Sequence, residues 1–423
     1  MTSPHRIRFA LLVALLPLAS IFAAAPEPDT DNGAIELPDG FGAVVVADDL
    51  GSLRFLAVRD NGDVYVKTKR DGIIALRDTD GDGRADEREE FGDGGGTGIA
   101  IHDGWLYHST DREVLRYRLD AGRLVPAGEP ETVIGELANQ RTHSAKAFTF
   151  DGDGMLYVEV GSPSNALGNP DRQRGAAGSS PEQIAEFQEK HGGVWRFDPN
   201  KTGQTQADGF RFSSGHRHII AIAWNPVSEA VFVVQQGRDQ LHTVAPDHYT
   251  TKDNAELPAE EMHLLREGAQ LGWPMTYWDP IKKTRMLAPE YGGDNKKRAK
   301  PGEFPDPLVA FPAHWSPLQM VYYSETQFPE KYHNGAFVAF HGSWNRAPEP
   351  QRGYCVAFVP FGDDGMPAGG YEKFADGFAG KEEIDSPRDA RFRPCGVAAG
   401  PDGSLYVSDT EKGRVWRIFY IGK

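Results

Sequence analysis

A short unit, in which a tight turn precedes a β-forming segment, recurs six times and constrains the fold of this chain more than any other feature. The six copies begin at Asn61, Asp103, Asp153, Asn225, Asn334 and Asp402. Asn-Gly and Asp-Gly supply the positive φ that a tight hairpin needs, and the residues after them favour strands. Most copies are followed by another short strand carrying an aromatic residue or arginine, as in EVLRYRL and GRVWRIFY. The pattern predicts an all-β fold, a six-bladed β-propeller with long loop insertions.

The spacing between the fourth and fifth copies is the longest, and it contains the basic, proline-rich stretch GGDNKKRAKPGEFPDP. An insertion of this length is usually a functional cover or a disordered flap. Only residues 180–192 have a helical pattern, with Pro181 in the first turn behind a serine cap. Since no internal linker separates two domains, residues 26–423 are expected to form one propeller domain.

The first 25 residues differ from the rest and are predicted to be a signal peptide. Arg6 and Arg8 precede the apolar run FALLVALLPLASIFA, and small residues follow it. This run is short for a membrane span and Pro17 interrupts it, although an uncleaved anchor is the alternative. We therefore expect export, to the periplasm or the medium, and no stable membrane insertion.

Charge and cysteine content limit the partners. The formal net charge is −16, and loss of Arg6 and Arg8 with the signal peptide would make it −18. Such a surface repels nucleic acid and suits neutral substrates or a basic partner. The two cysteines, Cys355 and Cys395, could pair in an exported protein, but the sequence does not show that they meet.

The stretch DTDGDGRADERE, between the first two units, has the spacing of a calcium-binding loop. Acidic residues stand at positions one, three, five, nine and twelve, and Gly83 allows a sharp turn. A bound Ca²⁺ would brace the loop, and a solvated acidic turn is the alternative. The expected ligands are Asp78, Asp80, Asp82, Asp86 and Glu89.

Polar residues occupy comparable places in several units, beside the strands that would approach the propeller axis. They are His143 and Lys146; His216, Arg217 and His218; His341, Trp344, Asn345 and Arg346; and Arg391 and Arg393. Taken singly, each is more typical of a structural or surface role, but their convergence favours a ligand site on the axis. Arginines two apart on a strand point to one face, and their guanidinium groups match carboxylates.

Several longer motifs point to a family. GRDQL, GWP, FVAFHGSWNR, VPFGDDG and GPDGSLYVSDTEKGRVWRI resemble the pyrroloquinoline quinone (PQQ)-dependent glucose/sorbosone dehydrogenases and their pyranose dehydrogenase relatives. The resemblance runs from about Leu37 to Tyr420. It implies oxidation of a small sugar (an aldose or sorbosone-type substrate), with PQQ and Ca²⁺ over the axial channel. A soluble electron acceptor of cytochrome or quinone type would follow.

The resemblance also implies roles for single residues. His143 matches the general base, and Arg217 matches the arginine that faces the quinone oxygens. The remaining positions match cofactor contacts, and Gly237 and Arg238 also match the backbone ligands of the cofactor calcium. The cofactor contacts are Lys69, Lys146, His218, Gln236, Gly237, Arg238, His341, Trp344, Arg391 and Arg393.

The chain departs from the family in two motifs that surround the cofactor. GHRH places His216 and His218 where the family has leucine and asparagine, and HSAK places Lys146 where it has arginine. These changes leave open a binding propeller that has lost the cofactor. A calcium-dependent lactonase, in which a metal activates water, is a third hypothesis. It needs acidic and asparagine side chains on the axis, whereas the polar residues identified above are mainly basic.

Overall fold

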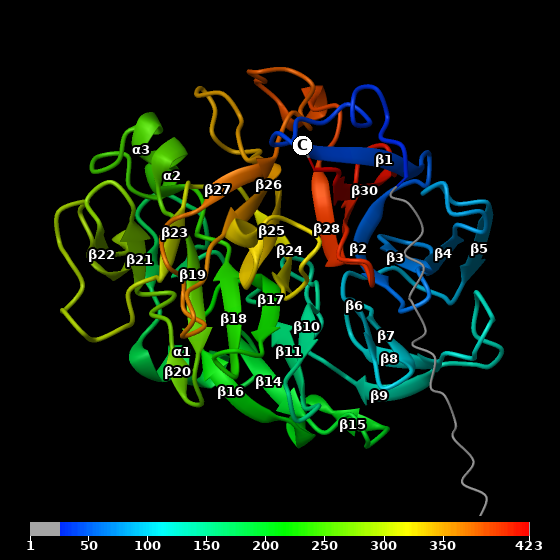
Figure 1. Cartoon of the computed structure of the whole chain (residues 1–423). Helices are drawn as coiled ribbons and strands as arrows, with labels where there is room; N and C mark the ends of the chain where they lie inside the picture. The colour runs from blue at the N-terminus through cyan, green and yellow to red at the C-terminus, as the bar shows by residue number, and fades with distance from the viewer. Residues whose placement is uncertain (1–25, 423) are drawn as a thin grey trace, which may run out of the picture.

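The computed structural model describes residues 26–422, and the regular secondary structure of this part of the chain is mainly β-strand. Six sheets of four or five strands are arranged in a ring (Figure 1). The predicted six-bladed propeller is therefore confirmed. The predicted signal peptide, residues 1–25, lies outside the described residues.

Each of the first five blades is built on four strands in chain order, paired antiparallel, and a short fifth strand adds in parallel to the second (β15, Gln204–Thr205) and third (β20, Ala269–Gln270). The first two blades contain β2 (Leu53–Val58), β3 (Val64–Thr68), β4 (Ile73–Arg77) and β5 (Glu87–Phe91), then β6 (Ile99–His102), β7 (Trp105–Ser109), β8 (Val114–Arg118) and β9 (Glu131–Gly135). The third contains β10 (Phe148–Phe150), β11 (Leu156–Val160), β14 (Gly193–Phe197) and β16 (Phe210–Ser214). The fourth and fifth contain β17 (Ile219–Asn225), β18 (Ala230–Gln235), β19 (Glu260–Leu265) and β23 (Val309–Phe311), then β24 (Pro317–Tyr323), β25 (Gly335–His341), β26 (Tyr354–Val359) and β27 (Glu372–Ala375).

The sixth blade combines strands from both ends of the described chain. It contains β28 (Pro394–Ala399), β29 (Leu405–Asp409) and β30 (Val415–Tyr420), and β1 (Phe41–Ala47) completes it. β1 runs antiparallel to β30, with Phe41 opposite Tyr420, so the blue and red segments lie side by side in Figure 1. This pairing closes the ring and satisfies two strand edges that would otherwise be exposed.

The six predicted turns each join the first strand of a blade to its second strand, so all six lie at one end of the propeller. The loops that enter the first strands and leave the second strands consequently gather at the opposite end. The first strands also contact one another in the circular order β2, β6, β10, β17, β24 and β28. The loops at this end therefore converge on the axis, which is where the candidate site lies.

Shorter elements decorate the blades. Between β11 and β16 in the chain they are β12 (Gly168–Asn169), β13 (Ala177–Gly178), α1 (Pro181–Phe187), β15 (Gln204–Thr205) and η1 (Gln206–Asp208). Between β18 and β23 they are α2 (Leu241–Val244), α3 (Thr251–Glu256), β20 (Ala269–Gln270), β21 (Thr276–Asp279), β22 (Thr284–Leu287) and η2 (Pro289–Tyr291). The last two are η3 (Glu330–Tyr332) and η4 (Pro387–Asp389). Helix α1 begins as predicted, with a capping box between Ser180 and Gln183 and with Pro181 in its first turn.

The long insertion of the fourth blade is neither a cover over the axis nor a flap without structure. The β21–β22 hairpin packs with Tyr249 and Leu257 in a small hydrophobic cluster. Lys297 ties the following segment to this hairpin: its carbonyl accepts the backbone N–H of Leu287, and its Nζ donates to the carbonyl of Gly292. None of residues 292–305 lines the axial pocket described below. The insertion therefore adds to the outside of the blade.

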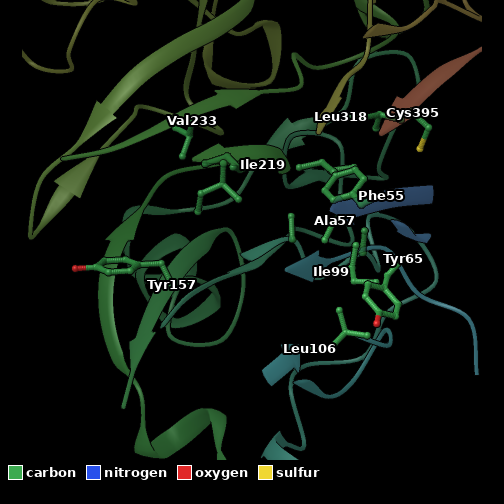
Figure 2. Packing of buried hydrophobic residues seen from close by; sticks show 14 of the residues in the cluster. Phe55, Ala57, Tyr65, Ile99, Leu106, Tyr157, Ile219, Val233, Leu318 and Cys395 are labelled. Atoms are coloured by element: carbon green, nitrogen blue, oxygen red, sulfur yellow. The ribbon is translucent and has the colours of Figure 1, made fainter. Parts of the chain in front are cut away.

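The core lies between the blades. Figure 2 shows Phe55, Ile219, Leu318 and Cys395, which come from four different first strands and belong to one buried cluster. Cys355 belongs to another cluster on β26, and both thiols are free, so these cysteines form no disulfide. Within residues 26–422 we find no helix with the length and apolarity needed to cross a bilayer.

Candidate active site

A pocket of about 210 Å³ lies among the axial loops. It brings together six of the residues that the sequence singled out: His143, Arg217, Gln236, Gly237, Trp344 and Asn345. The pocket also contains side chains that the predicted set of site residues did not include, and four of these are ionisable: Arg172, Asp239, Glu260 and His314. Loops from the third, fourth and fifth blades therefore build one site.

His143 is held in a single orientation. Its backbone has a φ of 57°, and its carbonyl accepts a hydrogen bond of 2.8 Å from Gln140 Nε2. The ring atom Nδ1 lies 2.5 Å from the carbonyl oxygen of Ser162. Because a carbonyl can only accept, Nδ1 carries the hydrogen and Nε2 keeps its lone pair. Burial, with the charges of Arg217 and His218, holds the pKa of His143 well below its ordinary value, so the ring is neutral.

His218 packs against His143 and is itself fixed by a buried carboxyl group. The two ring centroids are 4.7 Å apart. His218 Nδ1 lies 3.1 Å from Glu159 Oε1, which also accepts the backbone N–H of Ile219. A Cβ on Gly161 would lie 2.8 Å from both His143 O and His218 Nδ1, so only glycine fits between them. The predicted cofactor contact His218 is therefore a buried neighbour of His143.

Arg217 is buried at the floor of a charged network. Its Nη2 donates to Asp239 Oδ2 at 2.6 Å, and its Nε–H has no partner within residues 26–422. Arg172 Nη1 also lies 3.2 Å from Asp239, and Asn345 Nδ2 donates to Asp239 Oδ1 at 2.7 Å. Burial opposes ionisation of Asp239, but Arg217, His314 and Arg172 together hold its pKa below the ordinary value. Arg217 thus keeps its Nε–H available to a ligand, while Asp239 already balances its charge.

Glu260 is the second carboxyl group of the pocket. Its Oε2 accepts the backbone N–H of Gly237 at 2.6 Å, and its Oε1 accepts that of Ser316 at 3.1 Å. Burial raises the pKa of Glu260 to about 8, although both backbone donors favour the charged form. The sequence analysis missed this group. Glu260 is the first residue of the strand β19, and its local sequence gives no sign that it reaches the axis. Its hydrogen bond with Gly237, a residue of the GRDQL region, is what places it there.

Lys146, Arg238 and Lys69 do not line this pocket. Lys146 is completely buried, and its Nζ donates to the carbonyl of Ser144 at 2.6 Å. The side chain of Arg238 is also buried, and it pairs with Glu290. Lys69 is exposed and lines a neighbouring pocket. The side chains of Lys146 and Arg238 therefore point away from this pocket, because nearer acceptors hold both of them inside the protein. The backbone role predicted for Arg238 does not depend on its side chain.

The expected arginine pair is not a pair in space. Arg393 donates from Nε to His341 O and from Nη2 to Gly342 O, both at 3.0 Å. Arg391 is exposed and lines a separate groove beside Arg352. The prediction of a shared face is wrong because both residues precede β28, where the alternation of a strand does not apply. His341 lies on the Arg393 side, with Nε2 at 3.2 Å from Thr410 Oγ1.

The acidic loop joins β4 to β5 and gathers three of its five predicted ligands. Carboxylate oxygens of Asp78, Asp80 and Asp86 all lie within 4.8 Å of one another. Asp82 instead accepts the backbone N–H of Arg84 at 2.8 Å, and Glu89 lies on β5 opposite Ala75. Asp82 and Glu89 thus stand apart from the other three predicted ligands, because β5 begins at Glu87, before a twelve-residue loop is complete.

The sequence was also compared with known families. A family model described as TrAA12-like matches residues 35–420. The chain belongs to the TrAA12-like family. The family resemblance inferred from the motifs is thereby confirmed.

The curated relatives match this TrAA12-like chain over only part of their length. An uncharacterised protein of Borreliella burgdorferi is 26% identical over 208 residues, which cover 49% of this chain and 48% of that protein. A PQQ-dependent pyranose dehydrogenase of Coprinopsis cinerea is 26% identical over 233 residues, covering 48% of this chain and 29% of that enzyme. The match thus spans half or less of either relative.

Solved structures show the same fold. A calcium structure of a Trichoderma reesei family AA12 enzyme gives a TM-score of 0.73 at 18% identity, covering 92% of this chain and 97% of that chain. The holo PQQ domain of the Coprinopsis cinerea pyranose dehydrogenase gives 0.72 at 18% identity, covering 91% and 97%. The PQQ-bound aldose sugar dehydrogenase of Streptomyces coelicolor gives 0.54 at 16% identity, covering 91% and 99%. At these identities the TrAA12-like fold is what the structures share.

Proposed function

We propose that this protein is an exported dehydrogenase that oxidises an aldose or a sorbosone-type sugar with PQQ as cofactor and His143 as general base. A soluble cytochrome or quinone would then accept the electrons. Membership of the TrAA12-like family supports the reaction class. One observation carries the assignment to this pocket: the free Nε2 of His143 shares it with the unpartnered Nε–H of Arg217.

The residues of the pocket fit such a cofactor. Arg217 Nε and Asn345 Oδ1 are buried polar atoms without partners in the described chain, and buried polar groups normally have one. A quinone oxygen would accept a hydrogen bond from the first of these atoms, Arg217 Nε. Arg217, Gln236 and Trp344 would hold the group, with Arg217 at its oxygens and Trp344 at the pocket rim. When bound, PQQ would supply the carbon that accepts the hydride.

His143 would move the proton. Its Nε2 can take the proton from a substrate hydroxyl, because the ring is neutral and Nδ1 already carries its hydrogen. The Ser162 carbonyl would then stabilise the imidazolium through the same short contact. Arg217 would stabilise negative charge that develops on an oxygen in the pocket, since its guanidinium is fixed by Asp239 before the reaction begins.

Calcium also fits two places. Glu260, Asp239 and the backbone of Gly237 supply oxygen-rich chemistry at the pocket, which a hard cation prefers. Asp78, Asp80 and Asp86 supply three carboxylates in the β4–β5 loop. We assign a cofactor calcium to the first place and a structural calcium to the second.

A calorimetric titration of purified residues 26–423 with PQQ tests the proposal, first with calcium and then with excess chelator. We expect one-to-one binding that requires calcium, followed by sugar oxidation with an artificial electron acceptor. The variant His143→Ala should bind PQQ with unchanged affinity and lose turnover by about 10²–10⁴-fold. His102 offers a control. It is half-buried at the end of β6, beside the turn to β7 and therefore at the end of the propeller opposite the pocket, and it stacks on Phe150 of β10. His102→Ala should keep both PQQ binding and turnover.

Absence of PQQ binding in either condition would contradict the proposal and favour a propeller that binds a partner without a cofactor. A lactonase is not favoured. The pocket contains two carboxyl groups, contrary to the basic character predicted from the sequence. We assign those groups to a cofactor calcium, and the match to a PQQ-dependent pyranose dehydrogenase favours the redox reaction over hydrolysis.

A further inference from the structure

A second pocket, of about 520 Å³, adjoins the site at the same end of the propeller. The segment 142–145 lines both pockets, with Thr142 and His143 in the first and with Ser144 and Ala145 in the second. Three basic side chains and one acidic one line the second pocket: Arg54, Lys69, Arg112 and Asp111. Its chemistry therefore suits an anion that extends from the site of His143.

Arg54 is placed like the other axial residues. It is the second residue of β2, a first strand, and so it enters the ring at the same end as Arg217. The side chain is half-buried, and its Nε and Nη2 contact Thr97 Oγ1 at 3.3 Å and 3.1 Å. Within residues 26–422, neither Arg54 nor Lys69 makes an ion pair, whereas Arg217 and Arg238 each pair with a carboxylate. Arg54 is thus an oriented guanidinium with its charge uncompensated.

The charge of Arg54 acts on two histidines, His218 and His341. After burial, which is the main cause, Arg54 contributes to lowering the pKa of His218 and of His341. His218 packs against the proposed base, and the carbonyl of His341 is bound by Arg393. Arg54 is therefore close enough to His218 and to His341 for its charge to act on both, while Arg391 lines another groove.

We propose that Arg54, together with Lys69, binds carboxylate groups of the cofactor and takes the role that the sequence pattern assigned to Arg391. A guanidinium forms paired, charge-assisted hydrogen bonds with a carboxylate, and Thr97 already restricts this one. The inference rests on the proposed function, because it names which residues of this chain would hold the carboxylates of PQQ.

Calorimetric titration of the calcium-loaded protein with PQQ tests the inference, with Arg54→Gln, Arg54→Lys and Arg391→Gln compared. Arg54→Gln should raise the Kd by about 10–100-fold, the effect of losing a charged hydrogen bond. Arg54→Lys should recover part of the affinity, and Arg391→Gln should bind like the wild type. Circular dichroism and the Tm without PQQ should match for all four proteins.

Four results would overturn the inference. If Arg54→Gln binds PQQ like the wild type, or if Arg391→Gln weakens binding equally, Arg54 does not have this role. If Arg54→Gln leaves the Kd of PQQ unchanged but raises the KM for a uronic acid, the pocket holds a substrate carboxylate instead. Failure of the wild-type protein to bind PQQ would reject the proposed function, and this inference with it.

Discussion

The imidazole rings of His143 and His218 lie with their centroids 4.7 Å apart and their planes inclined by 35°. Behind them, Glu159 fixes His218 through its Nδ1. A buried carboxyl group, a buried ring and the candidate base therefore form one continuous stack. Its middle group is His218, which stands in the GHRH motif at a position where the family pattern has asparagine.

The variant His218→Asn should change the pH dependence of turnover. Burial, Arg217 and His218 all lower the pKa of His143, so the acidic limb of the kcat/KM profile should lie well below pH 6.5 in the wild type. Without the His218 ring, this limb should move up towards pH 6.5. Profiles measured between about pH 4 and 8 would show the shift, and His102→Asn should leave the limb in place. An unmoved limb in His218→Asn would mean that His218 only fills space.

Asp239 should be the most stability-sensitive residue of the pocket. Asp239→Asn removes the charge that pairs with the buried guanidinium of Arg217. Leaving such a charge uncompensated costs about 3–5 kcal/mol of unfolding free energy. Denaturant unfolding at pH 7 would measure the loss. The control is Asp247→Asn, because the exposed Asp247–Arg174 pair should contribute less than about 1 kcal/mol. Equal effects of the two substitutions would contradict the buried-pair argument.

His108 should make the protein sensitive to acid. Both ring nitrogens are buried without partners in the described chain, and burial, with the charge of Lys67, lowers the pKa to about 3 from 6.5. The unfolded chain therefore takes up a proton as the pH falls through 6.5, while the folded chain does not, so stability decreases below that pH. At pH 5 this loss is roughly 2 kcal/mol.

The variant His108→Phe keeps an aromatic ring next to Tyr117 and removes the titration. Its unfolding free energy should fall less than that of the wild type between pH 7 and pH 5, by roughly 2 kcal/mol. Parallel curves for the two proteins would show that His108 does not titrate in this range.

The β4–β5 loop should respond to calcium through its three clustered carboxylates. Adding Ca²⁺ at about 100-fold above its Kd should stabilise the folded chain by about 2.7 kcal/mol. Asp80→Asn should reduce that gain, and Glu89→Gln should not, because Glu89 lies on β5 away from the cluster. Thermal scans with calcium and with chelator would measure the gain. No difference between the scans would identify a solvated acidic turn.

The blades were predictable because each is encoded locally. An Asp-Gly or Asn-Gly turn and the strand after it lie within about ten residues, so the sequence specifies both without distant contacts. Helix α1 was predictable for the same reason, through Ser180 and Pro181. The helices α2 and α3 were missed, since four and six residues are too few to show a helical period.

The candidate site was only partly predictable. His143 and Arg217 stand within a few residues of the first strands that follow them, so their place in the repeat indicated the axis. Glu260 stands inside β19 and Arg54 inside β2, where nothing in the local pattern separates an axial side chain from a structural one. Arg391 was misplaced because the irregular backbone before β28 pairs with Ala379 rather than with a strand.

The closure of the ring by β1 and β30 has a consequence for synthesis of the protein. Every axial loop from Arg54 to Arg393 leaves the ribosome before β30 does, yet the circle that aligns those loops is complete only when β30 meets β1. A nascent chain halted before Val415 would carry all the proposed catalytic side chains and two unpaired strand edges. Translation of β30 therefore decides whether the blades close into an assembled site or remain an aggregation-prone open arc.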